Sequence, residues 1–206
     1  MKDIVNEIGL AHREVGADGE TRTILIRRRY HAEVKDVWDA ITTADRIARW
    51  FSPVTGDLRE GGHYQIQGNA GGEILTCEPP RHLKLTWVFG GGTSEVEVGL
   101  AEDGDATLLE LRHTAAVPPE MWDEYGPGAV GLGWDLALLG LVLHLRTGKS
   151  VSDPDGFGRT PEGADFIAAS GRAWGEAHRA AGATEEQATA AAERTIAFYT
   201  PSTTQG

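Results

Sequence analysis

Two residues of this sequence combine a side chain that can move a proton with a spacing that places it beside an apolar surface. His113 follows Leu109 and Leu111 at two-residue intervals, which in a strand puts all three side chains on one face. Tyr64 precedes Ile66 in the same alternation. An imidazole titrates near neutral pH, so His113 would suit a proton donor or acceptor at a pocket mouth. In an enzyme, His113 or Tyr64 would be the general acid or base. The pattern also fits a histidine at a strand end that only makes structural hydrogen bonds, and this interpretation is the favoured one.

A larger set of residues has the character of a binding surface. Aromatic and aliphatic side chains that line a cavity grip a flat or hydrophobic molecule, and a tyrosine adds a polar tip. The same rings would also serve to fill a core, and the pattern leaves both interpretations open. The predicted ligand-binding residues are Trp50, Tyr64, Trp87, Phe89, Leu109, Leu111, His113, Trp134, Leu138 and Leu141. No catalytic residue is assigned.

Other familiar chemistries lack their sequence patterns. Gly126, Gly128 and Gly131 have the spacing of a dinucleotide fingerprint, but Pro127 interrupts it and no strand precedes it. The chain has no nucleophile elbow, phosphate-binding loop or zinc-binding His-Glu-x-x-His helix. No histidine pairs with another histidine or a cysteine at close metal-ligand spacing. We therefore predict neither a metal nor a cofactor.

Composition narrows the partners and the compartment. The formal net charge of -12 repels nucleic-acid backbones and anionic membranes, so neither is predicted as a partner. Cys77 is the single cysteine, which favours a reducing compartment, and the first ten residues do not resemble an export signal. A cytoplasmic protein is predicted. The most apolar stretch, residues 130–145, contains Asp135 and His144 and is typical of a buried helix rather than a membrane span.

The elements that would position these residues follow from periodicity. Alternating apolar residues predict a strand at 21–31 and, between the glycine-rich turns of 54–114, an antiparallel meander. Helical spacing predicts a short helix near 34–41 and a long one at about 130–147. Two more helices are predicted in the tail, the first opened by Thr160-Pro161 and the second by a capping box at Thr184 to Gln187.

Domain organisation follows from the same pattern. At 206 residues the chain has room for one main domain, predicted at 21–147. Residues 1–20 show no convincing period and are predicted to be a loosely attached arm, and 148–206 a helical extension packed on the domain. The long helix is apolar nearly all round, so two of its sides must be covered. The sheet would cover one side, and the extension or a second copy in a homodimer would cover the other.

Short motifs follow one another along this order of elements. They are Val37-Trp38-Asp39-Ala40-Ile41, Arg49-Trp50-Phe51, Gly61-Gly62-His63-Tyr64, the run from Gly72-Glu73-Ile74 through Pro79, Leu85-Thr86-Trp87 and Thr107 to His113. Their order and spacing resemble the SRPBCC or START-like superfamily, and within it the homologues of the activator of the Hsp90 ATPase. The resemblance covers about residues 21–147. It implies an α+β helix-grip fold, in which a curved antiparallel sheet wraps around a long C-terminal helix and encloses a cavity.

The functional prediction is binding of a small hydrophobic or aromatic molecule in that cavity, between the sheet and the long helix. One alternative is a cofactor-independent enzyme of the cyclase or dehydratase type that uses His113 or Tyr64. A second alternative, suggested by the family's name, is an interaction module that stimulates a chaperone ATPase. One fold hosts many functions, so the fold alone does not choose among them.

Overall fold

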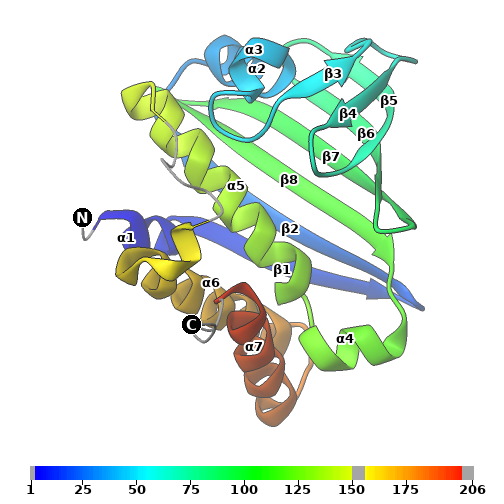
Figure 1. Cartoon of the computed structure of the whole chain (residues 1–206), viewed down its shortest axis with the longest axis vertical. Coiled ribbons are helices and arrows are strands. Elements are labelled where there is room, and N and C mark those ends of the chain that lie inside the picture. The colour runs from blue at the N-terminus through cyan, green and yellow to red at the C-terminus, as the bar shows by residue number, and fades with distance from the viewer. Residues whose placement is uncertain (1–2, 150–155, 201–206) are drawn as a thin grey trace. The chain divides into compact units, whose positions relative to one another are not determined.

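The computed structural model describes residues 3–149 and 156–200, and Figure 1 labels their elements. The helices are α1 (Asp3–Gly9), α2 (Val34–Thr42), α3 (Ala44–Ile47), α4 (Pro119–Tyr125), α5 (Gly128–Thr147), α6 (Pro161–Ala180) and α7 (Glu185–Tyr199), with the 3-10 helix η1 at Phe157–Arg159. The strands are β1 (Ala11–Asp18), β2 (Thr21–Tyr30), β3 (Val54–Gly56), β4 (His63–Ile66), β5 (Gly71–Glu78), β6 (His82–Phe89), β7 (Gly92–Asp103) and β8 (Ala106–Ala116).

All eight strands belong to one antiparallel sheet, in the order β1-β2-β8-β7-β6-β5-β4-β3. Each strand from β3 to β7 pairs antiparallel with the strand that follows it in the chain. This arrangement is the predicted meander. Strands that come before a group of C-terminal helices make the chain an α+β protein.

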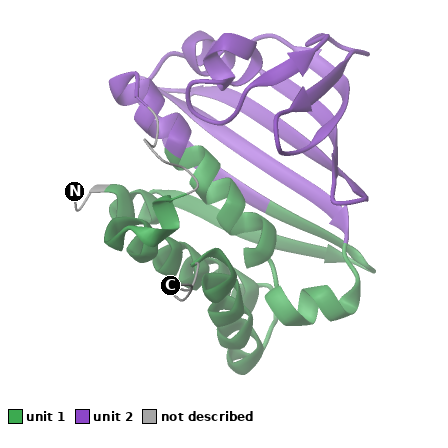
Figure 2. Ribbon diagram, in the orientation of Figure 1, with its two compact units in different colours: residues 1–24, 117–139, 151–206 green, residues 25–116, 140–150 purple. Residues whose placement is uncertain are grey.

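The chain divides into two compact units, coloured separately in Figure 2. Unit 1 consists of residues 1–24, 117–139 and 151–206, and unit 2 of residues 25–116 and 140–150. Most of the sheet belongs to unit 2, whereas α4, α6 and α7 belong to unit 1. The units cut across the domain bounds expected from the sequence, and those bounds stay a prediction.

The N-terminal segment is more ordered than the sequence analysis expected. Its described residues form α1 and then β1, at one edge of the sheet. Most β1 side chains are exposed or half-buried, in an alternating pattern that contains no fully buried residue. An edge strand with one weakly covered face therefore lacks the apolar alternation by which strands are recognised in a sequence.

The helices predicted in the second half of the chain are confirmed, with small shifts in their bounds. Helix α5 begins two residues earlier than expected and ends at Thr147. It is long and apolar enough to span a bilayer by length and composition, but 61% of the relevant window is buried, as expected of a helix in a protein core. The Thr160 hydroxyl caps α6, and Thr184 and Gln187 form the predicted capping box of α7.

A buried ion pair joins three segments of unit 1. The Arg13 guanidinium of β1 donates to both oxygens of Asp135 on α5, from Nε at 3.2 Å and from Nη2 at 2.8 Å. The hydroxyl of Ser170 and the indole nitrogen of Trp174, both on α6, donate to Asp135 Oδ2 at 2.6 and 3.0 Å. Arg13 also donates to the carbonyl of Ile8. Both charges are therefore buried with their hydrogen-bonding capacity well used, which offsets the cost of removing them from water.

Helix α7 also contacts the helices that precede it within unit 1. The Thr195 hydroxyl donates to the Tyr125 carbonyl at 3.0 Å, and the Tyr199 hydroxyl donates to the Ala129 carbonyl at 2.8 Å. These bonds use carbonyls at the end of α4 and the start of α5. The first half of α5 is thereby tied to both α6 and α7.

Replacing Gly131 with alanine is expected to lower the free energy of unfolding by about 1–2 kcal/mol, since overpacking outweighs the gain in helix propensity. A Cβ at this position would lie 2.2 Å from the Trp174 ring, which its hydrogen bond to Asp135 holds in place. Chemical denaturation measures the effect. Gly133→Ala is the matched control in the same helix, because its nearest atom is the Tyr199 hydroxyl at 3.1 Å. An equal loss at Gly133 would contradict the explanation.

Candidate functional site

Strands β5 to β8 of unit 2 present one continuous apolar face, here called the inner face. Cross-strand pairing places Ile74, Leu85, Val96 and His113 in a single row. A second row contains Trp87, Ser94 and Ala115, and a third contains Cys77, Leu83, Val98 and Leu111. Directly paired residues point to the same side of a sheet, so these three rows share one face.

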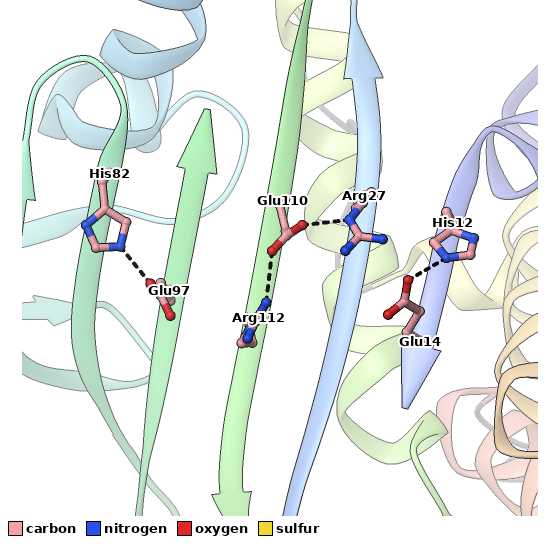
Figure 3. A network of polar contacts seen from close by, with 7 residues as sticks. All are labelled: His12, Glu14, Arg27, His82, Glu97, Glu110 and Arg112. Atoms are coloured by element: carbon pink, nitrogen blue, oxygen red, sulfur yellow. Dashed lines mark hydrogen bonds and ion pairs between the residues drawn. The ribbon is translucent and has the colours of Figure 1, made fainter. Parts of the chain in front are cut away.

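The opposite face of the same strands carries the charges. Lys84 pairs with Glu95 at 2.9 Å, and His82 with Glu97 at 2.7 Å. Figure 3 shows the His82–Glu97 contact and the separate group in which Glu110 accepts from Arg27 and Arg112. Figure 3 also shows His12 beside Glu14, two residues of β1. Glu110 and Arg112 pair with Gly99 and Glu97 and therefore lie on this outer face.

His113 is a buried, neutral histidine tied to a serine. Its Nε2 lies 2.7 Å from the Ser94 hydroxyl oxygen, which is itself 3.1 Å from the Trp87 carbonyl. A carbonyl only accepts, so Ser94 donates to Trp87 and accepts the proton of His113 Nε2. The Trp87 ring lies edge-on to the imidazole, with the two ring centroids 6.2 Å apart. Burial lowers the pKa of His113 to about 4, so the imidazole is neutral at pH 7.

We expect this histidine to make the protein less stable in mild acid. The folded-state pKa of His113 lies below its ordinary value of 6.5, so the unfolded chain binds more protons between those values. The free energy of unfolding should therefore fall by about 2 kcal/mol between roughly pH 7.5 and pH 5 through this residue alone.

His113→Gln, which retains an N–H group for Ser94, tests this expectation in urea unfolding at both pH values. The pKa of His144 and of His178 is also lowered, chiefly by burial, so both histidines contribute in the same direction. Only the difference between the two proteins isolates His113. Equal pH dependence in the wild type and the variant would refute the assignment.

Tyr64 reaches across a neighbouring strand because that strand has a glycine. Tyr64 on β4 is paired with Gly72 on β5, and its hydroxyl donates to the Thr86 carbonyl on β6 at 2.7 Å. The Thr86 hydroxyl in turn accepts from the Glu73 amide at 2.8 Å. Burial raises the pKa of Tyr64, so the phenol keeps its proton.

Trp50 lies on the segment after α3, against the second half of α5. Its indole nitrogen donates to the Ala40 carbonyl at 2.9 Å, and its ring stacks on Phe51 with centroids 5.6 Å apart. A Cβ on Gly140 would lie 2.5 Å from the Trp50 carbonyl oxygen, so the helix and this segment are in close contact. Leu141, the next residue of α5, is fully buried. The motif containing Trp50 thus positions α5 within unit 2.

The predicted ligand-binding residues have unequal surroundings. Tyr64, Leu109, Leu111, His113, Leu138 and Leu141 are buried, Trp50, Trp87 and Trp134 are half-buried, and Phe89 is 59% exposed. Phe89 is the last residue of β6 and is followed by a glycine-rich turn. It is the most exposed of the predicted ligand-binding residues. Trp134 and Leu138 belong to unit 1, and the other eight belong to unit 2. Their joint role as ligand-binding residues stays a prediction.

Ser94 is the polar residue of this face that the sequence analysis missed. The alternation that identified Val96 and Val98 extends back to position 94, so the signal was present. In residues 3–149 and 156–200, no group of three or more His, Cys, Asp and Glu side chains is placed to hold a metal ion.

Comparison with known families agrees with this architecture. The family model described as Activator of Hsp90 ATPase homolog 1-like protein matches residues 31–145, more than half of the chain. The chain belongs to this family. The predicted α+β helix-grip fold and the SRPBCC-like family are thereby confirmed.

Solved structures support the family's fold along most of the chain. CalU16 from Micromonospora echinospora is 39% identical, and the match covers 83% of this chain and 97% of CalU16 in its crystal structure, with a TM-score of 0.62. The solution NMR structure of CalU16 gives a TM-score of 0.70, with 96% of that chain covered. DynU16, from the dynemicin biosynthetic locus, is 23% identical, and the match covers 62% of this chain and 48% of the DynU16 chain. Its TM-score is 0.54, and at this identity the likeness shows the fold alone. No curated protein matches the chain.

Proposed function

We propose that this member of the Hsp90 ATPase activator homologue family binds a small hydrophobic or aromatic molecule on the inner face. One observation carries the proposal. Leu85 is half-buried although both of its cross-strand neighbours, Ile74 and Val96, are buried. Trp87, two residues along the same strand, is half-buried as well. A ligand that covers this apolar surface would gain about 25 cal/mol for each Å² removed from water.

The hydrogen bonds of the face favour binding over acid-base catalysis. His113 donates its proton to Ser94, and a pKa near 4 makes it a weak base at neutral pH. The Tyr64 hydroxyl donates to the Thr86 carbonyl and holds its proton, since its pKa is raised. Neither group has the pKa near the working pH that general acid-base catalysis requires. These features support a surface that recognises a molecule without transforming it.

Native mass spectrometry of freshly purified protein, followed by organic extraction, tests whether a molecule co-purifies. We expect an adduct of a few hundred daltons, the size that a small-molecule site accommodates (roughly 300–1,000 Å³). Leu85→Trp fills the inner face and should abolish the adduct. Lys84→Trp puts the same side chain on the outer face of the same strand and should retain it. If Leu85→Trp, folded by circular dichroism, keeps the adduct, the inner face is not the site.

The name of the family suggests a second partner, a chaperone of the Hsp90 type. The ATPase rate of a purified chaperone with and without this protein tests that prediction directly.

The homodimer and the cytoplasmic location stay predictions. Analytical ultracentrifugation measures whether the protein is a dimer.

A further inference from the structure

We infer that the ligand of the inner face is an uncharged, apolar molecule with an oxygen function at one end, and that this end lies against Ser94 and His113. The inference rests on the proposed function and adds the chemical class and the orientation of the ligand. It is argued from which side chains the strand pairing brings to the face, and from their order along it.

Every residue of β4 to β8 is described, and the three rows of the inner face carry no charged side chain. Glu102 is the one charged residue of these strands with inner-face parity, and it is exposed near the end of β7, beyond Leu100. The polar side chains with this parity are Tyr64, Ser94, Thr107 and His113, together with the thiol of Cys77. The outer-face positions hold the other charges, which include Glu73, Lys84, Glu95, Glu97, Glu110 and Arg112. An ionised ligand over the three rows would lose hydration without meeting an opposite charge there.

Ser94 and His113, which bond to each other, lie at one end of the three rows. Trp87 and Ser94 are cross-strand partners, and His113 occupies the adjoining row. The next row, beyond His113, contains Leu83, Val98 and Leu111 and is apolar apart from Cys77. A ligand that matches this order places its oxygen near Ser94 and His113 and its hydrocarbon over the leucines and valines.

The protonation states agree with an uncharged ligand. The pKa of His113 is lowered to about 4 and that of Tyr64 is raised, both by burial, so both side chains are neutral at pH 7. Ser94 donates its proton to the Trp87 carbonyl and accepts from His113, so its hydroxyl oxygen keeps a second lone pair that can accept from a ligand hydroxyl. The geometry of the rows and the neutrality of their polar groups therefore point to the same ligand class.

Within unit 2, β2 brings one cation to the inner side of the sheet. Arg27 binds Glu110 on the outer face, so alternation turns Arg28 inward, where it is buried with its guanidinium 5.7 Å from the Tyr30 ring. Arg28 already has partners in the folded chain. An anionic ligand would have to compete with those partners. An anionic probe is therefore a necessary arm of the test.

The test compares naphthalene, 2-naphthol and 2-naphthoate at neutral pH, three probes with one ring system and different substituents. Titrations followed by NMR report the Trp87 indole and the backbone amides of Ser94 and His113. We expect 2-naphthol to bind with shifts at these groups, and 2-naphthoate to bind at least about tenfold more weakly, since burying its carboxylate is costly.

Ser94→Ala tests the orientation. It should weaken 2-naphthol about fivefold, the effect of one lost neutral hydrogen bond, and leave naphthalene unchanged. Glu95→Gln, on the outer face of the same strand, is the control and should change neither. An equal loss for both probes in Ser94→Ala would show a structural effect and overturn the orientation.

The remaining outcomes separate this inference from the proposed function. If 2-naphthoate binds as tightly as 2-naphthol with the same residues shifted, the face binds small molecules but the uncharged class is wrong, and Arg28 becomes the candidate anchor. If none of the three probes shifts an inner-face residue, the proposed function fails along with the inference.

Discussion

Replacing Asp135 with leucine is expected to destabilise the protein by about 3–5 kcal/mol, the cost of leaving one partner of a buried ion pair without its counter-charge. The side chains of Arg13 and Asp135 are only 6% and 4% exposed, so water cannot replace the lost carboxylate. The change also removes the acceptor used by Ser170 and Trp174, both of which are buried. Urea unfolding monitored by circular dichroism measures the loss. We expect the far weaker pair Lys84–Glu95, broken by Glu95→Gln, to leave the midpoint unchanged within error.

A double variant separates the charge from the packing. Arg13→Met combined with Asp135→Leu removes both charges and keeps apolar volume in place, and such replacements of buried pairs are often neutral or stabilising. We expect the double variant to recover a large part of the stability lost by Asp135→Leu alone. If it is no more stable than the single variant, the network with Ser170 and Trp174, rather than the ion pair, accounts for the loss.

The second large effect is expected at Gly72 in the candidate site. A Cβ there would lie 2.1 Å from the Thr86 carbonyl oxygen, a backbone atom of the neighbouring strand. Relief requires β5 and β6 to separate locally, and the same carbonyl is the acceptor of the Tyr64 hydroxyl. Gly72→Ala should therefore lower the free energy of unfolding by about 3 kcal/mol, at the upper end of overpacking effects, and displace Tyr64.

Gly99→Ala is the matched control for that variant. Gly99 also lies within a strand of unit 2, but no heavy atom lies within 4 Å of a Cβ built on it. Alanine there should be neutral or slightly stabilising, because it restricts the unfolded chain. The Tyr64 hydroxyl and ring resonances should shift in Gly72→Ala and remain in place in Gly99→Ala. Equal stability of the two variants would show that the close approach at Gly72 carries no cost.

Local signals predicted the parts of the fold that depend on local physics. The capping box at Thr184 is a contact between residues three apart, and the alternation of Leu109 and Leu111 is a property of one strand. Periodicity also identified the inner face from Tyr64 to Leu111, because one buried side of a sheet imposes a two-residue repeat. The strand predicted at 21–31 and the helix predicted near 34–41 match β2 and α2 to within one residue at each end.

The features that the sequence left open have a common physical origin. Strand β1 is recognisable only through its place in the sheet, because an edge strand needs little apolar alternation. Phe89 has the parity of Trp87, yet it extends past the covered part of the sheet and is exposed. Ser94 belongs to the candidate site because it bonds to His113, which is 19 residues away in the chain. Pattern alone reports which face a residue occupies and leaves open what covers that face.

The sequence by itself determined the family, the α+β class, the order of the main elements from residue 21 onward and the side of the sheet on which the apolar residues of β2 and β4 to β8 lie. These follow from periods of two and 3.6 residues and from caps and turns, which involve only neighbours in the chain. Tertiary structure decided which side chains meet. His113 bonds to Ser94, and the Tyr64 hydroxyl crosses Gly72 to donate to the Thr86 carbonyl. Asp135 forms an ion pair with Arg13. Those contacts join residues from different elements, and their charge, pKa and strength depend on burial that exists only after the elements pack.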